Sequence, residues 1–202
     1  MAISKRKKKF FNVEIPLIGK ETQLQAFELE ELKGRYIKYD LTRLLRGKNL
    51  VLQAKVDLVD GEAVANATEL TLLPYYLKRM VRKGTNYVED SFSVQTLDTI
   101  IRIKPFLVTR RKVSRAVRKA LRNETKEELT KYLATRDKEE IFKEILRNNL
   151  QKTLSIKLKK IYPLSTCEIR IIKVEKFLEN SKIEKKSPAQ EEKIEAGIET
   201  KE

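Results

Sequence analysis

The amino-acid sequence predicts an α+β domain, and three observations support this fold class. Apolar and polar residues alternate, with the period of a half-buried strand, through most of residues 10–108. From Arg111 to about Leu158 the apolar residues recur with helical spacing instead, and residues 167–177 return to the strand period. A run of strands followed by helices and a last strand is typical of helices packed on an antiparallel sheet.

The strongest strand signals lie in residues 50–72. The segment 50–59 has an apolar residue at almost every second position, and Asp60-Gly61 is a short-hairpin signal that leads into a return strand over residues 63–72. Weaker alternation predicts further strands before and after this hairpin. These are residues 10–16, which precede a turn at Pro16 and Gly19, then residues 23–32, 35–41 and 87–97.

The helical segments have recognisable starting residues. Pro74 begins a short helix over residues 75–83. After a helix that ends near residue 122, Asn123 is expected to cap a second one and Asp137 a third. The last two helices mix their charges, as expected for an amphipathic pair packed on the sheet. Their apolar stripes are Leu129, Tyr132 and Leu133 in one helix, and Ile141, Ile145, Leu146, Leu150 and Leu154 in the other.

Composition argues against an enzyme. The 202 residues contain no histidine and one cysteine, Cys167, so an internal disulfide, a thiolate metal cluster and an imidazole general base are all missing. No apolar run approaches the ~18–20 residues that cross a bilayer. No secretory signal is evident either, so we expect a cytoplasmic protein. We predict no catalytic residue, no metal and no cofactor.

The most informative stretch is residues 100–123, which hold nine Lys and Arg residues and no Asp or Glu. Its second half has helical period and separates two faces. The apolar face comprises Val113, Ala116, Val117, Ala120 and Leu121, and the basic face Arg115, Arg118, Lys119 and Arg122. Helices that need only solubility mix their charges, because like charges repel at i,i+4. A purely cationic face therefore predicts a polyanion that covers it, and a solvated basic face is the alternative.

Other cationic segments extend this predicted binding surface. The net charge of +15 and the pI near 9.8 favour nucleic acid or anionic lipid as the partner. The candidate contact residues are Lys5, Arg6, Lys7, Lys8, Lys9, Lys78, Arg79, Arg82, Lys83, Arg110, Arg111, Lys112, Arg115, Arg118, Lys119, Arg122, Lys157, Lys159 and Lys160. Tyr75 and Tyr76 could stack on bases, although packing at the rim of the core is the simpler role.

Charge and apolar content also predict the domain boundaries. Residues 1–9 are expected to form a disordered basic arm that orders on a polyanion, because five consecutive cations cannot fold alone. Residues 179–202 have little apolar content and should form a disordered charged tail. Residues 10–178 are then the single folded domain.

Three stretches of the chain are distinctive. They are LKGRYIKYDLTRL at residues 32–44, FLVTRRKVSRAVRK at residues 106–119 and KIYPLSTCEIRIIKVEKF at residues 160–177. They resemble the small-subunit ribosomal protein family of the S-three-A type, which is found in archaea and eukaryotes, and the resemblance covers roughly residues 10–178. The chain lacks the longer N-terminal extension of the eukaryotic members, which favours an archaeal source.

The resemblance implies an antiparallel β-barrel-like core flanked by α-helices, seated on the platform of the small subunit near the messenger exit. It also implies as partners the small-subunit ribosomal RNA, neighbouring platform proteins and messenger RNA at the exit, with no membrane and no small-molecule substrate. The residues alone leave open whether the core closes as a barrel or stays an open sheet.

We therefore expect a structural ribosomal protein whose cations contact RNA phosphates rather than base edges. One alternative is a non-ribosomal RNA-binding module, or one that binds anionic membranes or acidic proteins through the same cationic helix. A nuclease that uses carboxylates and magnesium is a further alternative, but no residues single out such a site.

Overall fold

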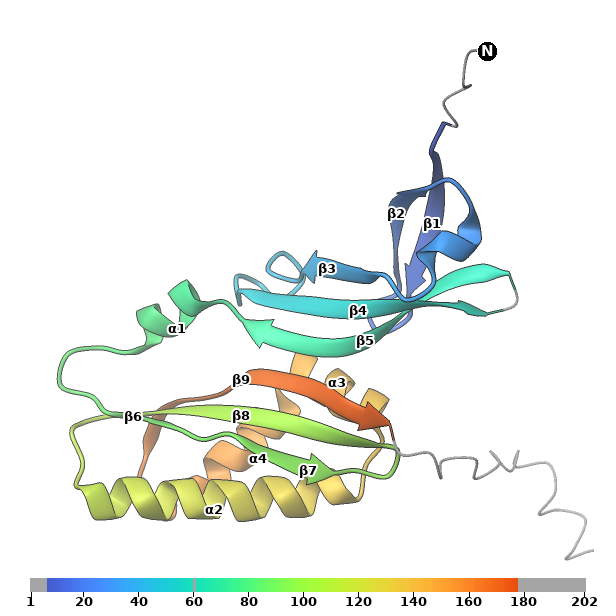
Figure 1. The fold of residues 1–202 in the computed structure, drawn as a ribbon. Helices are drawn as coiled ribbons and strands as arrows, with labels where there is room; N and C mark the ends of the chain where they lie inside the picture. Colours follow the sequence, from blue (N-terminus) through green and yellow to red (C-terminus); the bar gives the residue numbers. More distant parts are fainter. Residues whose placement is uncertain (1–6, 60, 178–202) are drawn as a thin grey trace, which may run out of the picture.

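The computed structural model describes residues 7–59 and 61–177, in which nine strands form one sheet and three longer helices cover part of it (Figure 1). The strands are β1 (Lys9–Ile15), β2 (Lys20–Ala26), β3 (Tyr36–Asp40), β4 (Leu50–Val59), β5 (Glu62–Leu72), β6 (Tyr87–Glu89), β7 (Phe92–Gln95), β8 (Thr99–Thr109) and β9 (Leu164–Phe177). The helices are α1 (Pro74–Met80), α2 (Arg115–Ala134), α3 (Lys138–Leu146) and α4 (Asn149–Leu158), with a 3-10 turn η1 (Leu29–Leu32).

The α+β class is confirmed, but the sheet is open. Its main strand order is β2-β1-β5-β9-β8-β6, with β3 and β4 joined beside β5 and β7 beside β8. The end strands β2 and β6 do not pair with each other, so within the described residues no closed barrel forms. Pairing is antiparallel except between β1 and β5, which run parallel where Val13 and Glu14 face Ala63 and Val64.

The hairpin of β4 and β5 is the best-predicted part of the fold. Its ladder runs from Leu50 opposite Leu72 to Val59 opposite Glu62, with one irregularity at Gln53. Gly61 closes the turn with a φ of 83°, a left-handed conformation that glycine adopts without strain. The predicted strand over residues 23–32 is shorter, because it ends at Ala26 and gives way to η1.

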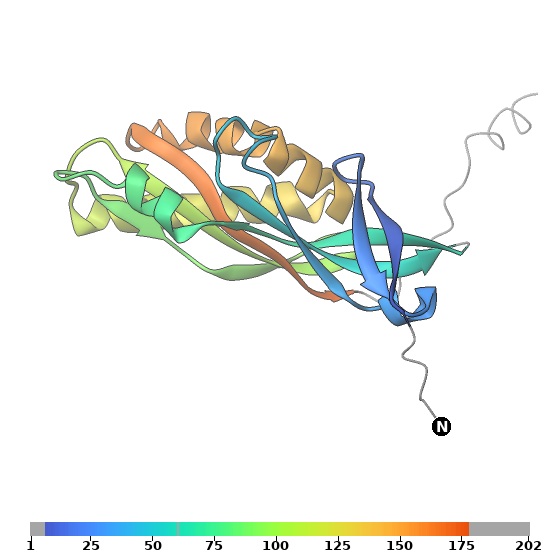
Figure 2. The same ribbon diagram turned by 90° about the horizontal axis from the view of Figure 1, so that it is seen from above.

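Two layers make up the C-terminal half. β8 pairs with β9 along almost its whole length, from Thr99 opposite Phe177 to Thr109 opposite Leu164. Helix α2 contacts β6 and β7, α4 contacts β9, and α3 reaches β5 (Figure 1). Seen from above, the molecule is elongated, with α1 at one end and the hairpin of β1 and β2 at the other (Figure 2).

Besides the contact of α3 with β5, two links join the N-terminal strands to this layered half. The first is the short ladder between β5 and β9, in which Glu69, Leu70 and Thr71 pair with three residues of β9. The second is a buried ion pair. The Lys48 ammonium lies 2.6 Å from a Glu168 carboxylate oxygen of β9 and donates a 2.6 Å hydrogen bond to Asn148 Oδ1. Lys48 thus ties the loop before β4 to both β9 and the helix layer.

The prediction that Asn123 begins a new helix is wrong, since α2 runs unbroken for 20 residues. Its inward side carries Leu121, Thr125, Leu129 and Leu133 at intervals of four, all buried. This stripe continues through the position of Asn123, so burial along one face outweighs the local capping signal. The helix begins at Arg115, not at residue 111, because the Ser114 side chain caps it.

The expected single helix after Asp137 is instead two. Asn148 adopts a left-handed conformation with a φ of 59°, which ends α3 and starts α4 in a new direction. Asparagine tolerates this conformation better than most residues, which is why the break falls there. Asp137 does precede α3, but its side chain makes no capping hydrogen bond.

Other predicted boundaries also move. α1 ends at Met80 because Val81 is extended, so Arg82 and Lys83 lie in a turn and not in a helix. The predicted strand over residues 87–97 is two short strands, β6 and β7. β9 begins three residues before the predicted start at Cys167.

Candidate nucleic-acid interface

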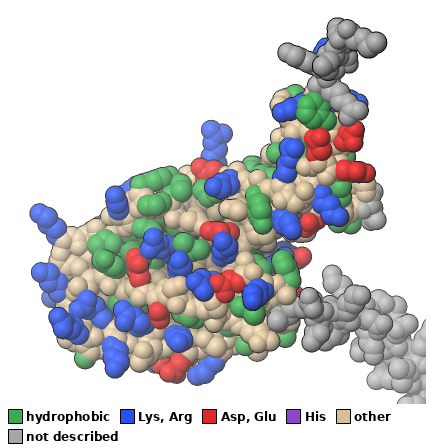
Figure 3. Space-filling view, viewed as in Figure 1, with side chains coloured by type: hydrophobic (Ala, Val, Ile, Leu, Met, Phe, Trp, Pro, Cys, Tyr) green, Lys and Arg blue, Asp and Glu red, His purple; other side chains and the backbone are tan. Residues whose placement is uncertain are grey.

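Predicted contact residues from four separate segments lie at the end of the molecule that holds α1, where Figure 3 shows Lys and Arg side chains gathered on the visible face. These segments are α1, the turn that follows it, the chain from β8 into α2, and the residues after α4. We call this surface the basic end. It comprises Lys78, Arg79, Arg82, Lys83, Arg110, Arg111, Lys112, Arg115, Arg118, Lys119, Arg122, Lys159 and Lys160, all of them exposed except Arg118, which is half-buried.

Hydrogen bonds around Asn86 join two of these segments. Asn86 Oδ1 accepts a 2.9 Å bond from the backbone N–H of Val113, and its carbonyl oxygen accepts one of 2.8 Å from the N–H of Thr109. The buried Thr109 hydroxyl lies 2.7 Å from the carbonyl oxygen of Arg111. The loop of residues 110–112 is therefore held against the turn that carries Arg82 and Lys83.

The turn itself is closed by Thr85. Its hydroxyl donates a 2.7 Å hydrogen bond to the Arg82 carbonyl oxygen, and its N–H donates one of 3.2 Å to the same atom. Gly84 takes a φ of 83° inside this turn. The cations of the turn are thus placed on ordered backbone next to the cations of residues 110–112.

The first turns of α2 differ from the predicted two-faced helix. Ala116 and Ala120, predicted as apolar contacts, are exposed beside Arg115 and Lys119. The inward stripe passes through Val117, a partly buried residue packed on the core, and Leu121. Arg118 lies next to this stripe, so it is half-buried.

The Arg118 Nε atom is buried without a hydrogen-bond partner in the described part of the chain. This nitrogen is therefore not accessible to an external ligand. The outward basic row that the helix offers is Arg115, Lys119 and Arg122, narrower than predicted.

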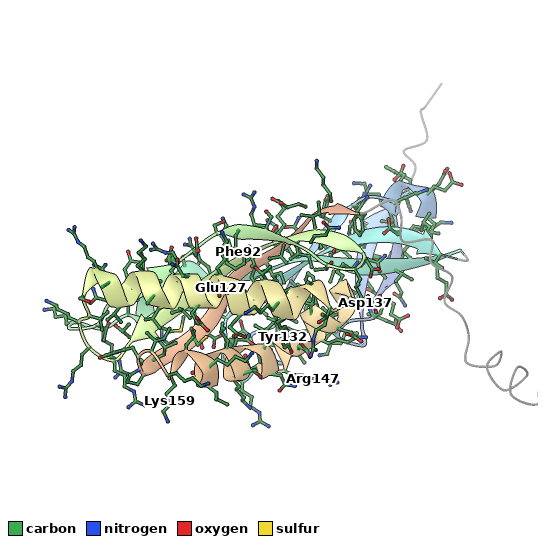
Figure 4. The ribbon with its side chains drawn as sticks, turned by 90° about the horizontal axis from the view of Figure 1, so that it is seen from below. Phe92, Glu127, Tyr132, Asp137, Arg147 and Lys159 are labelled. Atoms are coloured by element: carbon green, nitrogen blue, oxygen red, sulfur yellow. The ribbon has the colours of Figure 1, made fainter. Side chains whose placement is uncertain are left out.

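The residues after α4 reach the same end because α4 runs antiparallel to α2. Figure 4 shows Lys159 near the beginning of α2, with Arg147 and Asp137 toward the opposite end. Lys157 differs from its neighbours, since it forms an ion pair with Glu128 of α2. A hydrogen bond from Lys157 lowers the pKa of the Glu128 carboxyl, which keeps the pair charged. Lys157 thus joins two helices, and Lys159 and Lys160 stay exposed.

The cations of the basic end make no ion pair with any described acid. The ion pairs in residues 7–59 and 61–177 use other cations, chiefly in the sheet and the helix layer. They pair Arg35 with Glu31, Lys48 with Glu168, Arg102 with Glu175, Arg136 with Glu144, Lys143 with Glu139, Lys157 with Glu128, Arg170 with Glu89 and Lys173 with Glu69. The positive charge of the basic end is therefore not neutralised by these acids.

The described residues of the predicted N-terminal arm do not join this surface. Lys9 is the first residue of β1, and β1 lies at the opposite end of the molecule from α1 (Figure 1). Lys7 and Lys8 are exposed there, and the Lys8 ammonium lies 5.6 Å from the centre of the Phe27 ring. Lys5, Arg6 and the tail of residues 179–202 lie outside the described residues.

The two tyrosines of α1 have different surroundings. Tyr75 is 50% exposed at the start of the helix. Tyr76 packs against the core, and its burial raises the pKa of the phenol, with the Glu168 carboxylate adding to the rise. Sequence reasoning missed a third tyrosine, Tyr87, which is 54% exposed on β6. It also missed Asn86. The signal that could have identified Asn86 is its position just after the glycine turn at Gly84 and just before β6.

Few side chains in the described part of the chain are suited to catalysis or metal binding. Within the described ranges, no set of three or more His, Cys, Asp or Glu side chains is placed to hold a metal ion. Burial raises the pKa of the Cys167 thiol to about 12, and the nearby Glu168 carboxylate contributes. No helix of the described chain is long and apolar enough to span a membrane. The basic end is the feature that these residues offer to a ligand.

The fold and the basic end define a class, namely an α+β protein with a concentrated cationic surface. Comparison with known proteins narrows this class. The sequence model of the ribosomal S3Ae family matches residues 4–177. The chain therefore belongs to the ribosomal S3Ae family, which confirms the resemblance seen in the sequence.

Relatives in several archaea agree with this membership. The small ribosomal subunit protein eS1 of Pyrobaculum aerophilum is 33% identical over 189 residues, which cover 88% of this chain and 86% of the relative. The protein of the same name from Nanoarchaeum equitans is 30% identical over 173 residues, or 78% and 84% of the two chains. That from Saccharolobus islandicus is 26% identical over 181 residues, or 86% and 87%.

Proposed function

We propose that this protein is a structural component of the small ribosomal subunit and that its basic end binds ribosomal RNA. The observation that carries this proposal is the gathering of unpaired cations from four separate segments at one end. Like charges repel, so their concentration lowers the stability of the free protein unless a polyanion is bound. The name of the relatives, small ribosomal subunit protein, supports ribosomal RNA as that polyanion.

The binding mode follows from the kind of side chain. Arg and Lys on a helix and two loops form hydrogen bonds and ion pairs with phosphate oxygens, which position a protein on RNA without reading its sequence. The A-form major groove is too narrow for side chains to read, so shape and backbone contacts dominate. The beginning of α2 carries no acid in its first turn, and its partial positive charge adds to that of Arg115 and Lys119.

The wider setting is part of the same proposal and depends on family membership. We propose a seat on the platform near the messenger exit, with neighbouring platform proteins and messenger RNA as further partners. The protein would then lie in the cytoplasm with the ribosomes. A structural role needs no catalytic residue or cofactor, and we propose none.

The alternative of a membrane-binding module finds little support in the helix itself. Interfacial helices present bulky apolar residues to the bilayer. The exposed apolar residues near the basic row of α2 are Ala116 and Ala120, which bury little surface. RNA is therefore the ligand that we favour for this surface.

The direct test is a salt titration of binding to small-subunit ribosomal RNA. If about six phosphates are neutralised, affinity should fall by a few orders of magnitude between low and moderately high salt. The double variant Arg115→Gln/Lys119→Gln should weaken binding and reduce the salt slope by about 2. A matched control, Lys20→Gln/Lys33→Gln, removes the same charge from exposed residues of the opposite end and should leave the slope unchanged.

Membership of the ribosome is tested separately by sedimentation of a cell lysate through sucrose gradients. The protein should travel with the small subunit and remain there at moderate salt. A protein found wholly at the top of the gradient at low and high salt would contradict the ribosomal role. Equal salt slopes for the two double variants would contradict the assignment of the basic end.

A further inference from the structure

The aromatic pair at the edge of the sheet does not take part in the phosphate contacts described above. The ring of Tyr87 stacks on that of Phe106, with centroids 5.9 Å apart and planes inclined by 21°. Phe106 is 3% exposed, whereas Tyr87 is 54% exposed. One face of the Tyr87 ring thus rests on a buried aromatic residue, while more than half of the residue is open to solvent.

The position of Tyr87 on the edge strand β6 leaves its ring accessible to a ligand. β6 is the last strand of the sheet order and pairs only with β8, so no further strand of the described chain covers its outer edge. The Tyr87 hydroxyl donates no hydrogen bond to a described residue, so no polar contact turns the ring toward the protein. The stack on Phe106 fixes the ring without hiding it.

Cations lie near one end of β6, in the turn just before Tyr87 and in the loop that follows the neighbouring strand β8, whereas Glu89 and Asp90 follow Tyr87 along the chain. Arg82 and Lys83 are in the turn just before it. Its neighbour Asn86 is hydrogen-bonded to Thr109 and Val113, which flank the exposed loop of residues 110–112. A nucleic-acid backbone held by these cations would therefore pass close to the aromatic ring.

We propose that Tyr87 is a stacking platform for an unpaired RNA base. An exposed, rigidly backed aromatic ring among cations is the arrangement by which proteins hold splayed-out bases, since every base has a π-face and the phosphates need positive charge. This inference rests on the proposed RNA-binding function and adds to it. The basic end should therefore bind an RNA that has an unpaired nucleotide more tightly than it binds a continuous duplex.

The test compares two short RNA hairpins that differ only in one bulged adenosine, with the full chain and fluorescence anisotropy at fixed salt. The wild-type protein should prefer the bulged hairpin by about tenfold, the affinity of one base–aromatic stack. Tyr87→Leu should lose this preference but keep its affinity for the paired hairpin. Tyr87→Phe should retain the preference, because the ring is kept.

Leucine still covers Phe106, so Tyr87→Leu tests stacking rather than folding. Tyr36→Leu is the matched control, since Tyr36 is 60% exposed on β3, away from the basic end. Equal wild-type affinity for the two hairpins, or a preference that survives in Tyr87→Leu, would overturn the stacking site and leave the proposed function intact. Failure of the wild-type protein to bind either hairpin at low salt would overturn both.

Discussion

Removal of the Lys48 ammonium should strongly destabilise the protein, because it leaves a buried carboxylate without a counter-charge. The side chains of Lys48 and Glu168 are 9% and 15% exposed, and their charged atoms lie 2.6 Å apart. Breaking a fully buried pair from one side costs about 3–5 kcal/mol. The residual exposure of Glu168 favours the lower end, so we expect Lys48→Met to lower the free energy of unfolding by about 3 kcal/mol. For a domain of this size, that corresponds to a fall of about 6–12 °C in Tm.

The assay is urea unfolding followed by circular dichroism, on Lys48→Met, Glu168→Gln and the double variant. Because both single variants disrupt one contact, the double variant should be destabilised by clearly less than the sum of the two. Lys143→Met is the control. Lys143 pairs with Glu139 at 3.6 Å on the surface, with side chains 50% and 73% exposed, and its loss should cost at most about 0.5 kcal/mol.

Two results would refute this reasoning. A loss below about 1 kcal/mol for Lys48→Met would mean that water or a neighbouring group compensates Glu168. Strict additivity in the double variant would mean that the two residues stabilise the fold independently. Either outcome would leave the short ladder between β5 and β9 as the main link between the two halves.

Three further predictions concern single contacts. The pKa of Asp40 is lowered chiefly by the hydrogen bond from the Thr42 hydroxyl. The folded state therefore gains stability above the ordinary pKa near 3.8 and loses that stability as the pH falls through the lowered value. Thr42→Val should raise the Asp40 pKa in an NMR titration and reduce the loss of stability in acid, and an unchanged pKa would contradict this prediction. The partly buried thiol of Cys167, whose pKa is raised to about 12, should react slowly with a thiol reagent at neutral pH and rapidly after unfolding in urea. Rapid labelling of the folded protein would contradict this expectation. Asn86→Ala leaves the Val113 N–H without its acceptor, so it should lower the free energy of unfolding in urea by about 1–2 kcal/mol and weaken RNA binding. Asn86→Asp keeps an acceptor oxygen and should lower the free energy of unfolding by less.

Local signals predicted those elements in which pattern and turn chemistry agree. The hairpin of β4 and β5 is the clearest example, because strict alternation and Asp60-Gly61 specify the same register. Asn123 shows the opposite case. A local capping residue competes with a buried stripe that continues through it, and burial of Leu121 and Leu129 decides the outcome.

The separate basic segments could be found in the sequence, but their meeting could not. It depends on the turn at Asn148, which directs α4 back toward the start of α2, and on the hydrogen bonds of Asn86. The role of Lys157 was equally hidden, since its partner Glu128 is 29 residues away in the chain. Side-chain contacts between distant segments have no local pattern, so only the folded structure separates this lysine from Lys159.

Two sets of described cations therefore have different roles in this protein. One set, which includes Lys48, Arg102 and Lys173, is paired with acids and joins strands or helices that are distant in sequence. The other set lies at the basic end without described acidic partners, where its mutual repulsion opposes folding and its attraction for phosphate favours binding. Within α2, Arg115 and Lys119 are like charges at i,i+4, which destabilise a helix by a few tenths of a kcal/mol. Neutralising them should therefore leave the free protein at least as stable while it weakens RNA binding, so stability and binding are separable by mutation in this chain.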